Sequence, residues 1–224
     1  MPAYDMLFLE IKGYEHLPVK NRFIRLRDNA SALALILPGI LYSCDDPLLY
    51  YTSNLLLERS TDVLQLWSDY TISDYQSRSK EKQLEWLVGD ANAMIRVGQS
   101  QREYQKLILV GKSLGTVTIG KLLLEDRTLS NIYTIWFTPL FGFRFVLDGA
   151  LRLRNPGLFL GGTADRTYSA DAFESIRTHA GFETLILDGV NHSLEFDNDI
   201  LRSIGTMKDI MLVVKNFLDR SVFS

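Results

Sequence analysis

Residues 106–116 read KLILVGKSLGT. The branched, apolar run within 106–111 predicts a buried strand, and apolar residues at helical spacing from Thr116 to Asp126 predict a helix. The turn between them has the pattern Gly-x-Ser-x-Gly with Ser113 at its apex, which is typical of a nucleophile elbow. Gly111 and Gly115 fit this interpretation, because side chains at these two positions would collide with neighbouring backbone.

The same residues could also end a phosphate-binding P-loop, which is the main alternative interpretation of Gly111, Lys112 and Ser113. A P-loop needs a glycine five residues before Gly111 and a loop between the two glycines. Position 106 is lysine, and the intervening residues are apolar. The P-loop interpretation is therefore rejected.

Composition excludes several classes of partner. The chain has 224 residues and a net charge of −3, with no cluster of Lys and Arg, so we expect no nucleic-acid partner. Cys44 is the single cysteine, and the histidines lie far apart at positions 16, 179 and 192, so we expect neither a disulfide nor a bound metal. The N-terminus lacks a signal-peptide pattern, and the apolar runs are too short to cross a bilayer. We therefore expect a cytoplasmic location and no membrane span.

Strand and helix signals alternate along the chain. The predicted strands lie at 5–12, 20–27, 31–37, 63–70, 106–111, 132–137, 157–160 and 182–187. The predicted helices lie at about 46–60, 116–126, 169–180 and 199–220, and a further helix within the polar stretch 73–99 is marked by apolar residues from Leu84 to Val97. This alternation predicts a single α/β domain over 1–224, with a doubly wound, mostly parallel eight-stranded sheet that opens with an antiparallel hairpin.

The C-terminal helix carries its apolar residues on a single stripe. The stripe comprises Leu201, Ile204, Met207, Ile210, Met211, Val214, Phe217 and Leu218. Such a stripe either packs in the core or binds a partner, and we expect core packing.

A serine nucleophile needs a base, and the base needs an acid that fixes its tautomer. Asp165 follows a predicted strand in the segment LFLGGTAD, and His192 follows the next one in LILDGVNHS. Both residues therefore lie at the edge of the sheet where ligands bind in open α/β folds. Asp148 and Asp188 are alternative acids that we rank below Asp165.

The three segments together resemble the α/β-hydrolase fold over essentially the whole chain. The matching residues are GKSLG at 111–115, GGTAD at 161–165 and NHSLE at 191–195. The resemblance implies Ser113 as nucleophile, Asp165 as the acid of a catalytic triad and His192 as general base.

An oxyanion hole needs two backbone N–H groups. The first is that of Leu114, which follows the nucleophile at the start of its helix. The resemblance implies that the second comes from the loop after the third strand, at Ile40. Many relatives carry His-Gly at this point, whereas this chain has Pro38-Gly39.

The segment 141–155 is long enough for one helix and too short for a cap domain, so we expect an open site. Tyr42 and Phe141, with Phe143 and Phe145, are candidates for an apolar wall that contacts the substrate; the alternative is packing between helix and sheet. No charged cluster lies near the predicted site, which favours a small or medium neutral ester or thioester as the acyl substrate. This mechanism needs no metal or organic cofactor.

Two other functions are compatible with these residues. A peptidase or amidase uses the same triad, but we find neither a dedicated acidic pocket nor a gating domain. A non-catalytic ligand-binding or signalling module on the same fold usually has a broken triad, and this triad is intact in the sequence. We therefore predict a serine hydrolase of the carboxylesterase or thioesterase type.

Overall fold

The computed structural model describes residues 2–224, and its framework is a sheet of eight strands in the order β1-β2-β4-β3-β5-β6-β7-β8. The strands are β1 (Tyr4–Leu7), β2 (Asn21–Leu26), β3 (Ala32–Leu37), β4 (Thr61–Leu66), β5 (Lys106–Lys112), β6 (Tyr133–Phe137), β7 (Gly157–Gly162) and β8 (Phe182–Leu187). The eight-stranded α/β architecture predicted from the sequence is therefore confirmed.

The sheet opens with an antiparallel hairpin, as predicted. Strand β2 pairs antiparallel with both β1 and β4, and all other neighbours pair in parallel. In β3 every residue is buried, which matches its continuous apolar sequence, because helices cover both faces of the parallel part. The carboxyl ends of β3, β5, β6, β7 and β8 consequently lie along one edge of the sheet.

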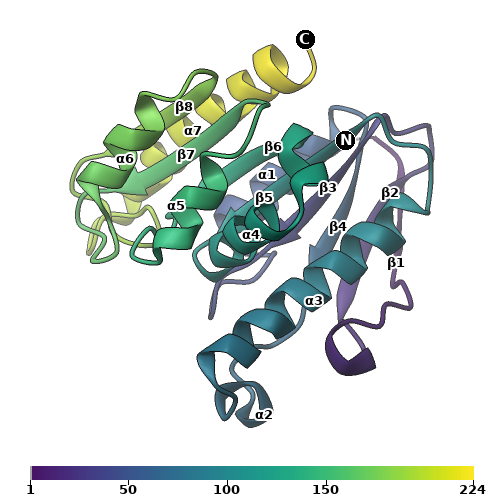
Figure 1. The fold of residues 1–224 in the computed structure, drawn as a ribbon. Coiled ribbons are helices and arrows are strands. Elements are labelled where there is room, and N and C mark those ends of the chain that lie inside the picture. The colour runs from purple at the N-terminus through teal and green to yellow at the C-terminus, as the bar shows by residue number, and fades with distance from the viewer. Residues whose placement is uncertain (1) are drawn as a thin grey trace.

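Helices cover the two faces of the sheet (Figure 1). The α-helices are α1 (Pro47–Leu57), α2 (Ser73–Gln76), α3 (Lys80–Gln99), α4 (Leu114–Glu125), α5 (Arg144–Ala150), α6 (Ala170–Arg177) and α7 (Ile200–Phe217). Helices α1 and α7 contribute to one hydrophobic cluster, and α3, α4, α5 and α6 to the cluster on the opposite face. None of the helices in residues 2–224 is long and apolar enough to cross a membrane.

The connection between β6 and β7 contains one α-helix, α5, and no inserted domain. Glycines let α5 approach α4 closely: a Cβ on Gly149 would lie 2.1 Å from the carbonyl oxygen of Gly120. The helix therefore lies tightly against α4, and no cap is built on this connection.

The prediction that the whole apolar stripe of α7 packs in the core was wrong for its first half. Ile210, Val214 and Phe217 are buried, whereas Leu201 is 78% exposed and Ile204 is 60% exposed. The first turns of α7 line an open groove beside α1, so their apolar side chains do not reach the sheet.

Candidate active site

Ser113 occupies a strained turn between β5 and α4. Its backbone has φ 51° and ψ −110°, a left-handed conformation that is costly for a residue with a side chain. The turn depends on close backbone contact, since a Cβ on Gly115 would lie 1.9 Å from the carbonyl oxygen of Leu37. The turn expected from the sequence therefore requires glycine at position 115, because any larger residue would collide with β3.

His192 and Asp165 are joined by a hydrogen bond. The distance between His192 Nδ1 and Asp165 Oδ2 is 2.7 Å. The second carboxylate oxygen of Asp165 accepts from both the backbone N–H and the hydroxyl of Thr167, each at 2.8 Å. Because Nδ1 donates a hydrogen bond to the carboxylate, Nε2 of the neutral imidazole is free to accept a proton.

The environment of Asp165 keeps it ionised. Burial raises the pKa of this carboxyl, but the hydrogen bonds from His192 and Thr167 outweigh burial, and the net effect is a lowered pKa. An ionised Asp165 can orient the ring and stabilise the imidazolium that forms during a proton transfer.

The alternative acids lie elsewhere. Asp148 is on α5 and pairs with Arg144 at 2.9 Å. Asp188 accepts a hydrogen bond from Thr163 Oγ1 at 2.8 Å. Of the three candidates, Asp165 is the one that contacts the imidazole of His192.

The backbone of His192 lies beside the elbow. Lys112, the residue before Ser113, donates from Nζ to the backbone carbonyl of His192 at 2.8 Å. The structure records no hydrogen bond between Ser113 Oγ and the His192 ring, two fully described residues. Catalytic hydrogen bonds are often long before substrate binds, so this arrangement is compatible with a triad.

The predicted oxyanion-hole residues flank Ser113. A Cβ on Gly39 would lie 3.1 Å from Ser113 Cβ, so the loop after β3 lies directly on the elbow. Leu41 in this loop has a positive φ of 55°. The N–H groups of Ile40 and Leu114 donate to no other described residue, which leaves both free at the edge where Ser113 lies.

Tyr42 holds the same loop in place. Its hydroxyl accepts a hydrogen bond from the backbone N–H of Leu48 at 3.1 Å. Burial raises the pKa of the Tyr42 hydroxyl well above its ordinary value, so the phenol stays neutral. Tyr42 lines a hollow beside the loop, together with Ile40 and Trp67.

Phe141, the other predicted substrate contact, lies in the core instead. Its ring is 6% exposed and packs against Phe159 and Phe173. The physical reason is that Phe141 precedes α5 and points back to the sheet, which is the packing alternative left open by the sequence. Phe143 and Phe145 line a cavity at the site.

This cavity, hereafter the acyl cavity, has a volume of about 570 Å³ and adjoins the elbow. Its lining is mainly apolar and includes both predicted oxyanion-hole residues: Ile40, Tyr75, Gln76, Lys80, Glu81, Gln83, Leu84, Leu87, Leu114, Val117, Leu140, Phe143 and Phe145. The contribution of α2 and α3 was missed at the sequence level, because apolar residues such as Leu84 at helical spacing look the same whether they face a core or a cavity.

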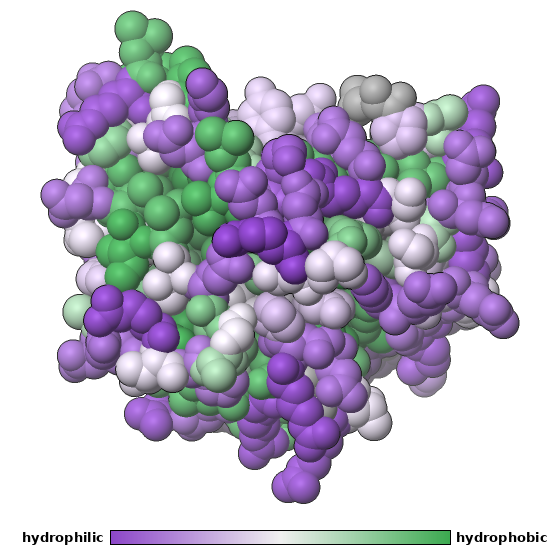
Figure 2. Space-filling model, turned by 90° about the horizontal axis from the view of Figure 1, so that it is seen from above, coloured by the Kyte–Doolittle hydropathy of each residue, from purple (hydrophilic) through white to green (hydrophobic). Residues whose placement is uncertain are grey.

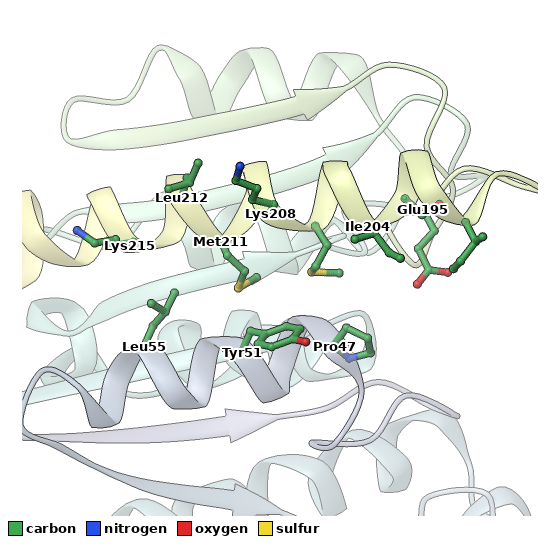
Figure 3. Close-up of a pocket in the computed structure, with 12 residues that line it drawn as sticks. Pro47, Tyr51, Leu55, Glu195, Ile204, Lys208, Met211, Leu212 and Lys215 are labelled. Carbon is green, nitrogen blue, oxygen red and sulfur yellow. The ribbon is translucent and has the colours of Figure 1, made fainter. Parts of the chain in front are cut away.

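A second apolar hollow, hereafter the α1/α7 groove, has a volume of about 510 Å³. Figure 3 shows Tyr51 and Leu55 of α1 facing Ile204 and Met211 of α7 across it, while Lys208 points away from α1. Seen from above, hydrophobic residues gather in a hollowed area on the side where Figure 1 places β8 and α7, and hydrophilic residues cover most of the remaining surface (Figure 2). Ser113, Asp165 and His192 do not line the groove, although Glu195 follows His192 closely in the sequence.

Cys44 is not a competing nucleophile. It is buried, and burial raises the pKa of its thiol well above the ordinary value. The thiol donates to the carbonyl oxygen of Leu66 at 3.4 Å. In residues 2–224 no three His, Cys, Asp or Glu side chains group in a way that suits a metal ion.

Two residues of the site were missed at the sequence level. Thr167, two residues after Asp165, fixes the carboxylate, and a hydroxyl residue at this spacing is a common turn signal. Lys112 is 1% exposed, and its position between a buried strand and Ser113 was the available signal.

Comparison with solved structures identifies the fold. An α/β serine hydrolase without lid from Xanthomonas campestris superposes with a TM-score of 0.70 at 17% identity, over 96% of this chain and 94% of that chain. An esterase from Pyrococcus furiosus superposes with a TM-score of 0.71 at 13% identity, over 97% and 93% of the two chains. The esterase Est1E from Butyrivibrio proteoclasticus gives 0.72 at 12% identity, over 98% and 99%. The chain therefore has the α/β-hydrolase fold, in a form without a lid.

No protein-family model and no curated protein matches the chain.

Proposed function

We propose that the protein is a serine hydrolase that cleaves small or medium neutral esters or thioesters. One observation carries the proposal: the 2.7 Å hydrogen bond between His192 Nδ1 and the buried Asp165 is held beside a strained serine elbow. A strained non-glycine residue is retained where the surroundings enforce it, which is typical of functional sites. The esterase and serine hydrolase structures that share the fold support the same class.

In the proposed mechanism His192 Nε2 removes the proton of Ser113 while Oγ attacks the carbonyl carbon of the substrate. The N–H groups of Leu114 and Ile40 stabilise the oxyanion of the tetrahedral intermediate. The imidazolium then protonates the leaving alcohol or thiol, and an acyl-enzyme remains on Ser113. A water molecule, deprotonated by His192, releases the acid and restores the serine hydroxyl.

The acyl cavity supports a neutral, apolar acyl or aryl group. Its two charged side chains, Lys80 and Glu81, have opposite sign, and Leu84, Leu87 and Val117 form an apolar surface. A solved structure that shares the fold is Est1E with ferulic acid bound, and another is a dienelactone hydrolase from Anabaena variabilis. These ligands and activities belong to those proteins; for this chain the cavity favours neutral esters as a class.

The test is labelling of purified protein with a fluorophosphonate probe, followed by hydrolysis of p-nitrophenyl esters of increasing chain length. Wild type is expected to be labelled, whereas Ser113→Ala and His192→Ala are expected to lose both labelling and turnover. Ser175→Ala, an exposed serine on α6, is the matched control and is expected to behave like wild type. A folded wild type without labelling would contradict the proposal and favour a non-catalytic module; labelling with cleavage of amides only would favour an amidase.

A further inference from the structure

Lys112 is a buried lysine for which the proposed chemistry has no use. Its side chain is 1% exposed, and no ion pair joins it to a carboxylate among residues 2–224. A buried ammonium without a paired carboxylate costs folding free energy, so such a residue needs a compensating role.

The ammonium of Lys112 instead contacts three separate loops at the edge that carries Ser113. It donates to Thr138 Oγ1, after β6, at 2.9 Å and to the carbonyl oxygen of His192, after β8, at 2.8 Å. It also lies 5.0 Å from the ring centroid of Tyr42 in the oxyanion loop, which is a cation–π distance. The ammonium thus has two hydrogen-bond acceptors and one aromatic ring around it, and these three partners come from three different segments of the site.

All three of these segments have unfavourable backbone conformations at the site. In the oxyanion loop, Leu41 has a φ of 55°. Thr138 has a φ of 45°, and Leu194, in the loop of His192, has a φ of 60°. Such conformations persist only where surrounding contacts enforce them. The contacts of Lys112 hold these segments at or close to the residues with unfavourable backbone conformations.

The charge state of the side chain fits this arrangement. Burial lowers the pKa of Lys112 to about 8, and the nearby Asp165 carboxylate raises it in part. At neutral pH the side chain is therefore an ammonium, with all three of its hydrogens available.

We propose that Lys112 is a positioning residue that ties the His192 loop and the oxyanion loop to the elbow. By fixing the carbonyl of His192, it fixes the backbone from which the imidazole contacts Asp165. The catalytic consequence rests on the proposed function, but the tether itself does not.

The test compares Lys112→Met with wild type by hydrogen exchange and by ester kinetics. Methionine has a similar length and keeps the site filled, but it cannot donate. Lys106→Met is the matched control, because Lys106 lies in the same strand and also donates to a backbone carbonyl, that of Val222, away from the triad. Both variants are first tested for folding by thermal and urea unfolding.

If the proposal holds, Lys112→Met keeps a cooperative unfolding transition at or near the wild-type midpoint, while amides in 188–199 exchange at least tenfold faster than in wild type. The kcat for a p-nitrophenyl ester then falls about 10- to 100-fold, with less than threefold change in KM. The reason is that the base is displaced, whereas the surface that binds the substrate is unchanged. Lys106→Met leaves exchange in 188–199 and both kinetic constants unchanged. Thr138→Val, which removes one of the two hydrogen bonds, shows an intermediate effect on exchange.

Unchanged exchange in 188–199 for folded Lys112→Met would overturn the tether, whether or not wild type hydrolyses esters. Faster exchange with unchanged kcat would overturn the positioning role. If wild type cleaves no ester at all, the proposed function fails, and the exchange result still decides whether Lys112 holds the loop. Global loss of stability in Lys112→Met, with faster exchange throughout the sheet, would show a structural role only and would also overturn the proposal.

Discussion

The acyl cavity and the α1/α7 groove are two apolar hollows of nearly equal size, about 570 Å³ and 510 Å³. Both are lined by a helix that carries exposed or half-buried apolar residues, and both open to solvent. Only the acyl cavity contacts the elbow, through Leu114 and Ile40. The groove is lined by Glu195 and by residues of α1 and α7, none of which belongs to the triad.

The difference teaches that size and apolarity do not identify a reaction site. Chemistry requires a polarised nucleophile, a positioned base and donors for developing charge. The residues proposed for these roles, Ser113, His192, Leu114 and Ile40, follow strands at the carboxyl edge of the sheet. The α1/α7 groove has the size and apolar lining of a binding site, but none of the residues proposed for these chemical roles lines it.

The largest effect is expected at the triad. Asp165→Asn should lower kcat for a p-nitrophenyl ester by about 10³- to 10⁴-fold, because the amide favours the wrong tautomer of His192. The matched control is Asp188→Asn, which removes the neighbouring rival acid and should leave kcat within about twofold of wild type. Equal losses in the two variants would contradict the assignment of Asp165.

A pH effect on stability is expected at Lys112, on the acyl-cavity side of the comparison. Its pKa is lowered by burial from 10.5 to about 8 in the folded protein. Between about pH 8 and 10.5 the unfolded chain therefore holds a proton that the folded protein has lost, so the free energy of unfolding contributed by this group rises with pH. The gain relative to Lys112→Met should approach about 3 kcal/mol at pH 10.5. Urea unfolding of both proteins at pH 7, 9 and 10.5 measures it, and the tyrosines that also titrate in this range cancel in the difference.

A bulky substitution should change the selectivity for acyl chain length when it fills the acyl cavity, and it should not do so when it fills the α1/α7 groove. Leu84→Trp narrows the acyl cavity and should lower the ratio of octanoyl to acetyl ester turnover, measured as kcat/KM, by about tenfold, a loss comparable to a few buried methylene groups. Ile204→Trp fills the groove and should leave the ratio within twofold of wild type. A changed ratio in Ile204→Trp alone would show that the acyl chain binds in the α1/α7 groove, and it would contradict the assignment of the acyl cavity.

The smallest effect is expected on the exposed half of α7. Ile204→Gln should change the free energy of unfolding by no more than about 0.5 kcal/mol, because the side chain is already largely in water. Ile210→Ala, six residues further along the same helix at a fully buried position, should cost about 2–4 kcal/mol. Urea unfolding at pH 7 compares the two, and similar costs would mean that the groove is closed in solution.

The fold and the pairing of Asp165 with His192 could be predicted from the sequence because they depend on local signals. The elbow is encoded by two glycines around a serine between a strand and a helix, and Asp165 and His192 each follow a strand whose pattern is clear. Parallel pairing then brings the three residues to one edge without any knowledge of side-chain packing.

The remaining features depend on packing, which periodicity does not reveal. An apolar stripe predicts that one side of a helix avoids water, but it does not say how far that helix lies over the sheet, so Leu201 was expected in the core. Phe141 and Phe143 are two residues apart, and only the entry into α5 decides that the first is buried and the second lines the cavity. Lys112 is a charged residue type that would be expected at the surface, yet it is buried. Its three partners are distant in the sequence, so no local pattern predicts them.

The contact between Lys112 and His192 joins residues 80 positions apart, and the second of them follows β8, which lies at the edge of the sheet and pairs only with β7. Contacts of such large sequence separation form late, because the loop between them must close first. During synthesis or refolding, the turn at Ser113 is consequently expected to form before the loop of His192 is fixed beside it. The proposed hydrolytic activity should then return later during refolding than the signals that report the central strands.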